Sequence, residues 1–227
     1  MKILMEDTTT SKVAKRITAL REASGVVTLG RVLTLVISTD EPGLESALTA
    51  ANAASLEHPC RIILLALGDP DGPDRLDAEL RVGGDAGASD VVILRGSGAN
   101  ARPDESLVAA LLLPDAPIVV WWPGEAPAVP SETPLGRLAH RRITDTAAAP
   151  HAERGLWRRR DGHRAGDTDM AWTRLTLWRI QVAAILDDLD PASVESVTVD
   201  GAPDSPSTLL LASWLAPVSY THLTLPT

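Results

Sequence analysis

Two apolar runs that flank a predicted helix restrict the fold of this chain more than any other feature. Arg31–Thr39 is rich in β-branched residues and carries one charge, which is typical of a strand buried on both faces of a sheet. A helix is predicted from Asp40, as N-cap, to about Glu57, and Ile62–Leu67 is the second apolar run. This order of strand, helix and strand predicts two parallel strands joined by a right-handed crossover.

The rest of the first half also alternates between helical and strand patterns, which predicts an α/β domain with a mixed sheet. The string GGDAG, Gly83–Gly87, is expected in a turn. A dinucleotide-binding motif would need a buried strand before these glycines and a helix after them. The elements expected around this turn are the helix Ser11–Ala23, the strands Leu76–Val82, Val91–Leu94 and Ile118–Trp122, and the helix Asp104–Leu112.

A proline-rich segment at residues 123–134 is the expected linker between two domains. We therefore predict an N-terminal α/β domain at residues 1–122 and a second, incomplete α/β domain at residues 135–217. The second domain has too few strands for a sheet of its own. Its expected elements are the helix Leu135–His140, the strand Arg141–Thr144, an irregular polar segment Ala147–Arg164, the helix Asp169–Leu189, the strand Val194–Val199 and the helix Ser205–Leu215.

The last ten residues, Val218–Thr227, differ in composition from the rest of the chain. They contain its only tyrosine, in a sequence without phenylalanine, and they resemble a translated sequencing adapter. We expect a non-native tail joined to a natural chain that was cut near Pro217, which would explain the incomplete second domain. An ordinary C-terminal strand is the alternative, and a natural reading frame that runs through Thr227 would favour it.

Charge and cysteine content limit the classes of partner and the compartment. The chain has 227 residues and a formal net charge of −9, which argues against nucleic acid or an anionic membrane as a partner. The single cysteine, Cys60, rules out an internal disulfide and suits a reducing compartment. No apolar stretch is long enough for a signal sequence or a membrane span. We expect a soluble, cytoplasmic protein.

No motif brings together residues for catalysis, and neither GxxxxGK[ST] nor GxSxG occurs. His58 and Cys60 lack the second pair that a tetrahedral metal site needs. His163, Asp167 and Asp169 could ligate a hard cation, but acidic residues in a GDTD loop more often cap the helix that follows. We therefore expect no catalytic site, no metal and no cofactor.

An arginine-rich stretch, Arg154–Arg164, forms a basic island in this acidic chain. Guanidinium groups match phosphate and carboxylate bidentately, so the island could bind a sugar phosphate or an acidic partner surface. A solvated basic loop is the alternative. The arginines concerned are Arg158, Arg159, Arg160 and Arg164.

Tryptophan and arginine together predict a partner-binding surface. Trp121 and Trp122 project to opposite faces of one strand end, and Trp172 and Trp178 lie about 600° apart on the predicted helix, so at least one ring should be near the surface. Both residue types are enriched at interface hot spots, although core packing is the alternative for any single tryptophan. The predicted contacts are Trp122, Arg141, Arg142, Trp172, Arg174, Trp178 and Arg179.

Several long motifs in one order resemble the OpcA family of glucose-6-phosphate dehydrogenase assembly proteins. They are EHPCR at Glu57–Arg61, LLPDAPIVVWWPG at Leu112–Gly124, PLGRLAHRRITD at Pro134–Asp145 and GDTDMAWTRLTLWR at Gly166–Arg179. The resemblance runs from about Thr8 to Pro217. His163–Ala165 stands where the family has an aromatic residue and a proline, and Leu177 stands where members often have proline.

The resemblance implies a non-enzymatic protein that binds glucose-6-phosphate dehydrogenase and acts as its assembly factor and allosteric activator in the oxidative pentose phosphate pathway. Family members are longer than this chain. Some photosynthetic relatives couple activation to thioredoxin through cysteines, but Cys60 alone cannot form an internal switch.

Two other functions stay open at the level of the sequence. One is an enzyme of sugar-phosphate metabolism, with the arginine island as substrate clamp and Asp167 or Asp169 as base. The other is a metabolite-sensing module, with its ligand at the carboxyl edge of the sheet near Asp40, Gly68 and Trp122.

Overall fold

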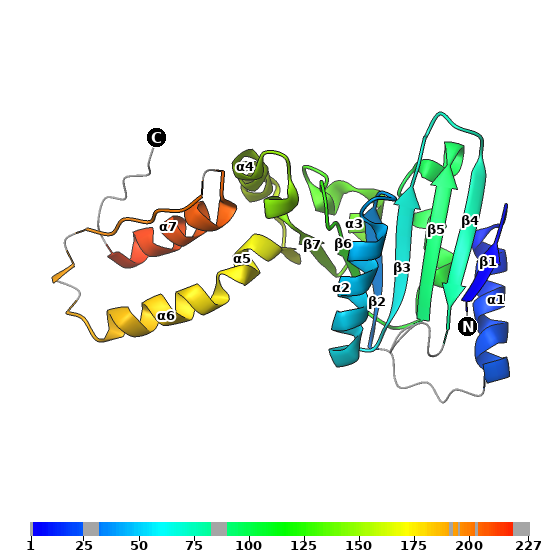
Figure 1. Cartoon of the computed structure of the whole chain (residues 1–227), viewed down its shortest axis with the longest axis horizontal. Coiled ribbons are helices and arrows are strands. Elements are labelled where there is room, and N and C mark those ends of the chain that lie inside the picture. Colours follow the sequence, from blue (N-terminus) through cyan, green and yellow to red (C-terminus); the bar gives the residue numbers. More distant parts are fainter. Residues whose placement is uncertain are drawn as a thin grey trace.

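The computed structural model contains an eight-stranded mixed sheet, so the predicted α/β class is confirmed (Figure 1). The structure describes residues 2–24, 32–82, 90–190, 193–194, 196–202 and 204–219. The strand order is β1-β4-β5-β3-β2-β6-β7-β8. The strands are β1 (Lys2–Met5), β2 (Leu33–Thr39), β3 (Cys60–Leu67), β4 (Arg75–Arg81), β5 (Asp90–Ser97), β6 (Ile118–Trp121), β7 (Arg141–Thr144) and β8 (Asp167–Asp169).

Strands β5, β3, β2, β6, β7 and β8 run parallel to one another, and β4 pairs antiparallel with β5 and with β1. The predicted parallel pair is therefore confirmed as β2 and β3. Seven of the eight residues of β3 are buried. Its apolar run reflects a central position with side chains packed on both faces, as expected for a parallel sheet.

Helices cover both faces of the sheet. Helix α1 buries Val13 and Ile17 in a core that also holds Val36 and Ile63, whereas α2 buries Leu48 in the core of the opposite face. Both helices were predicted from their apolar periodicity. Helix α2 begins later than predicted, with Gly43 and not Asp40 as its N-cap, and the Asp40 carboxylate accepts a hydrogen bond from the Gly43 amide at 2.9 Å. The α-helices are α1 (Thr10–Ser24), α2 (Leu44–Glu57), α3 (Pro134–Leu138), α4 (Ala152–Gly162), α5 (Met170–Arg174), α6 (Thr176–Asp187) and α7 (Pro206–Ser219). The 3₁₀ turns are η2 (Gly98–Ala101), η3 (Glu105–Leu107), η4 (Ala109–Leu111), η5 (Pro130–Glu132) and η6 (Thr146–Ala148).

The sheet continues past the proline-rich segment. Strand β6 precedes residues 123–134, β7 follows them, and the two strands pair in parallel. The segment contains η5, and Thr133 caps α3 by accepting a hydrogen bond from the Gly136 amide at 3.0 Å. Leu135 of α3 is fully buried. One sheet thus crosses the expected boundary, and the division into domains at 1–122 and 135–217 stays a prediction.

Several predicted elements differ in the structure. The segment Ala147–Arg164, expected to be irregular, contains η6 and α4, and Asp104–Leu112 forms two 3₁₀ turns in place of a helix. Leu175 separates α5 from α6 within the predicted helix Asp169–Leu189. The described residues of Val194–Val199 form no strand, and β1 and β8 were not predicted.

The sequence patterns record apolar periodicity, so an element without it is missed. Helix α4 buries little besides Ala152 and Gly162, so it lacks an apolar stripe. Two further predictions fall outside the described residues. They concern the turn at Gly83–Gly87 and the tail from Tyr220 onward.

Candidate functional site

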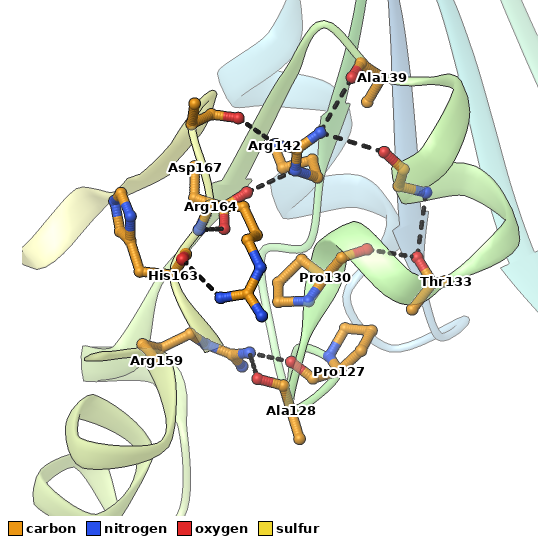
Figure 2. A network of polar contacts seen from close by, with 12 residues as sticks. Pro127, Ala128, Pro130, Thr133, Ala139, Arg142, Arg159, His163, Arg164 and Asp167 are labelled. Atoms are coloured by element: carbon orange, nitrogen blue, oxygen red, sulfur yellow. Dashed lines mark hydrogen bonds and ion pairs between the residues drawn. The ribbon is translucent and has the colours of Figure 1, made fainter. Parts of the chain in front are cut away.

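A buried ion pair holds the last two strands of the sheet together. Arg142 on β7 is 7% exposed, and its Nε donates to the carboxylate of Asp167 on β8 (Figure 2). Its Nη1 donates to the carbonyl oxygens of Gly136 and Ala139 at 3.2 and 3.0 Å, and its Nη2 donates to that of Ala165 at 2.5 Å. Arg142 therefore joins α3, β7 and the start of β8.

Asp169 fixes the start of α5, as the capping prediction required. Its carboxylate accepts from the Ala171 amide at 3.0 Å and from the hydroxyls of Thr144 and Thr146 at 2.7 and 2.9 Å. The carboxylates that the sequence offered as alternative catalytic bases, Asp167 and Asp169, are thus both engaged in contacts that hold β7, β8 and α5 in place.

Arg174, the last residue of α5, makes a bidentate ion pair with Asp145 at the end of β7. The Arg174 Nη1 and Nη2 atoms lie 2.7 and 2.5 Å from the two carboxylate oxygens. These hydrogen bonds raise the pKa of Arg174 above its ordinary value. About half of the Arg174 side chain stays exposed, but its guanidinium group is already bound. Arg174 therefore positions α5 against the sheet.

The aromatic rings at the α5–α6 junction are accessible. The Arg179 guanidinium lies 3.7 Å from the centroid of the Trp172 ring, and its Nη2 donates to the Thr176 hydroxyl at 3.1 Å. Trp172 and Arg179 are seven residues apart, close to two helical turns, which brings them to one face. Trp178 lies elsewhere on the helix circumference and is 60% exposed.

Helix α6 exposes its large apolar side chains. None of its residues is buried. At 100° per residue the most exposed ones fall within about half of the helix circumference. They are Leu177 (72% exposed), Trp178 (60%), Ile180 (59%) and Ile185 (62%). Figure 1 shows α6 leading away from the sheet. We call Trp172, Leu177, Trp178, Arg179, Ile180 and Ile185 the α5–α6 surface.

The other predicted contacts lie apart from this surface. Trp122 is 4% exposed in the core, where its amide donates to the Ile143 carbonyl at 3.0 Å. Arg141 is exposed at the start of β7, and Arg142 is buried because alternate strand residues point to opposite faces. A partner cannot reach Trp122 or Arg142 without rearrangement of the fold. The exposed apolar residues Ile180 and Ile185 were not among the predicted contacts, because that prediction considered tryptophan and arginine alone.

Arg159 of α4 holds the proline-rich segment. Its Nη1 donates to the carbonyl oxygens of Pro127 and of Ala128, the latter at 3.1 Å (Figure 2). Its Nη2 donates to the carbonyl oxygen of Ala126 at 2.8 Å. Burial lowers the pKa of Arg159 from its ordinary value. The island that was expected to be a loop is therefore a helix, with one arginine committed to backbone contacts.

The described residues offer neither a metal site nor a membrane-spanning helix. Their His, Cys, Asp and Glu side chains form no group of three that could hold a metal ion. None of the described helices combines the length and the apolar character needed to cross a membrane.

Two family models match the chain. Residues 51–161 match the model described as glucose-6-phosphate dehydrogenase subunit N-terminal domain, and residues 165–221 match the model described as the C-terminal domain of that subunit. The first region ends at Asp161 in the last turn of α4, and the second begins at Ala165, just before β8. No significant match was found among curated proteins or among solved structures.

Proposed function

This chain belongs to the OpcA family of glucose-6-phosphate dehydrogenase assembly proteins, and we propose that it binds the dehydrogenase and activates it allosterically. In this proposal the protein is not itself an enzyme. It acts in the cytoplasm, in the oxidative pentose phosphate pathway, and uses neither a nucleic acid nor a membrane as partner.

The α5–α6 surface is the observation that carries the proposal. Large apolar side chains rarely cover one side of an exposed helix unless a partner buries them. Tryptophan and arginine dominate the binding energy of many interfaces, and this surface contains the stacked pair Trp172 and Arg179 and, on a neighbouring side of the helix, the exposed Trp178. We propose these three residues as the central contacts, with Leu177 and Ile180 as their apolar neighbours.

The remaining predicted residues are not central contacts in this proposal. Arg174 holds α5 against Asp145, and Arg142 holds β8, so both keep the surface in a fixed position. Trp122 supports the core beneath the proline-rich segment. Arg141 is exposed on β7 and is a separate, outlying contact.

The activation would follow from a shift of populations. A protein that binds the active assembly of the dehydrogenase more tightly than the inactive one moves the equilibrium by the difference in binding free energy. A typical coupling of about 1–3 kcal/mol changes the affinity for substrate about 5–150-fold. The protein therefore needs no catalytic residue of its own.

Replacement of one exposed ring tests the proposed surface. Trp178→Ala should weaken binding of the dehydrogenase by about 2 kcal/mol, or roughly 30-fold, because central interface tryptophans contribute energy of this size. Titration calorimetry with the purified dehydrogenase would measure it.

A matched control is Leu56→Ala, which removes an equally exposed apolar side chain (70%) from α2. This variant should bind like the unchanged protein. Equal affinities for all three proteins would contradict the proposed surface.

A further inference from the structure

A hollow opens at the carboxyl ends of β2 and β6. From β2 the chain continues to β3 and β5 on one side, and later to β6, β7 and β8 on the other, so the direction of winding reverses between β2 and β6. Ligands of doubly wound sheets bind at such a switch point. Ser38 of β2 and Trp122 after β6 line the hollow, whose volume is about 570 Å³. That volume is in the range of small-molecule sites.

The two walls of the hollow come from the proline-rich segment and from α4. Pro127 contributes to the first wall, and Arg154, Arg158 and Arg159 contribute to the second. Arg159 joins the two walls through its hydrogen bonds to the backbone of residues 126–128. The cavity is therefore held by polar contacts.

The charge of the lining is positive. None of the three arginines makes an ion pair with a carboxylate in the described part of the chain, and Glu125 is the only acidic residue among the described lining residues. Arg154 and Arg158 are exposed and four residues apart on α4, so their side chains are neighbours across one helical turn. Their like charges repel each other, and a bound anion would relieve this repulsion. The Nε of Arg159 is buried and lacks a hydrogen-bond partner among the described residues.

The arginine side chains, rather than the start of the helix, are the groups available to an anion. The amides of Ala152 and Glu153 at the start of α4 donate to the carboxylate of Asp204 at 3.1 and 2.9 Å. A phosphate group matches the forked donors of two arginines better than a single carboxylate oxygen does.

We propose that this hollow binds a small phosphorylated metabolite of hexose phosphate size. Arg154 and Arg158 hold the phosphate, and the carbon skeleton lies against Pro127 and Ala128 of the proline-rich wall. The inference goes beyond the proposed function, since it concerns a ligand of this chain alone and not the contact with the dehydrogenase.

Titration calorimetry on the isolated full chain tests the site, with glucose 6-phosphate, glucose, gluconate and inorganic phosphate as probes. Glucose 6-phosphate should bind with one site per chain and at least about tenfold more tightly than each of the other three, because only it offers both the phosphate and the skeleton. If glucose binds as tightly as glucose 6-phosphate, the phosphate has no role in binding. If gluconate binds as tightly, the site does not prefer phosphate to carboxylate. If inorganic phosphate binds as tightly, the carbon skeleton has no role.

Variants locate the site. Arg154→Ala and Arg158→Ala should each weaken binding of glucose 6-phosphate by about tenfold or more, whereas Arg16→Ala, which removes an exposed arginine of α1, should leave it unchanged. All three positions are exposed, so the three variants and the unchanged chain should have the same melting temperature in the absence of ligand.

Two results would overturn the proposal: no binding of glucose 6-phosphate by the unchanged chain, or equal losses in all three variants. If no metabolite binds, a separate titration of the two α4 variants with the dehydrogenase that shows lost binding would assign the arginines to an acidic partner surface. Because the dehydrogenase is absent from the calorimetry, a failure here is separate from a failure of the activator role.

Discussion

Glu79 on β4 is a buried carboxylate surrounded by cations. Arg81 Nε lies 2.6 Å from its carboxylate, Lys2 Nζ 3.0 Å and Arg95 Nη1 3.7 Å. Burial alone would raise the pKa of Glu79, but the hydrogen bonds and the positive charges of Arg81 and Lys2 together outweigh it and lower that pKa below its ordinary value. The charged form is therefore favoured in the folded chain.

This lowered pKa gives a pH dependence with a definite sign. Because the folded pKa is below the unfolded one, the stabilisation is present above the unfolded value of about 4.3 and is lost as the pH falls through the folded value. Denaturant unfolding between pH 7 and pH 3 should show a smaller loss of unfolding free energy for Glu79→Gln than for the unchanged chain. The control Glu22→Gln changes an exposed residue of α1 and should follow the unchanged chain. Coinciding pH profiles for all three proteins would contradict this account.

Two adjacent arginines on β7 should differ sharply in their contribution to stability. Arg142→Ala leaves Asp167 without its cation in a site where both side chains are largely buried, which typically costs about 3–5 kcal/mol of unfolding free energy. Arg141→Ala removes an exposed side chain and should change that free energy by less than about 0.5 kcal/mol. Chemical denaturation would measure both, and similar losses would show that Arg142 is not a buried link between strands.

At the scale of elements, the strands and helices that could be predicted are those whose own residues carry a clear apolar periodicity. Strands β2 and β3 and helices α1 and α2 are of this kind. Strand β8 was missed because its residues, Asp167–Asp169, are polar and become a strand through pairing with β7. The cap at Asp169 could be predicted, since it depends on the chemistry of a few neighbouring residues.

Helix α6 shows a different limit of sequence patterns. The periodicity around Ile180 and Ile185 correctly indicates an apolar side, but it does not say what covers that side. The same pattern suits a core helix and a helix that awaits a partner. In the structure both side chains are exposed, which favours the second interpretation.

Loss of the Arg174–Asp145 ion pair should loosen α5 without unfolding the sheet. Arg174→Ala leaves the largely buried Asp145 carboxylate without its charged donor, which costs about 1–3 kcal/mol. Hydrogen exchange should become faster at the amides of α5, while the amides of α2 keep their protection. The control Trp178→Ala should leave α5 exchange unchanged, and unaltered exchange in Arg174→Ala would show that this ion pair does not anchor the helix.

At the scale of the whole molecule, one parallel strand pair joins the two regions that the family models match. Strand β7 lies in the first region and β8 in the second. Helix α7 contacts both α4, which lines the hollow, and α5, which begins the proposed interface. The fold class and the family could be predicted from the sequence, but the hollow could not, because residues from β2, the proline-rich segment and α4 come together only in three dimensions.

The activator role is tested most directly by the rate of NADPH formation by the purified cognate dehydrogenase, measured across glucose 6-phosphate concentrations with and without this protein. We predict a lower half-saturating concentration, a higher maximal rate, or both, with the effect reduced by Trp178→Ala and retained by Leu56→Ala. Superimposable rate curves with and without a saturating amount of the protein would contradict the account.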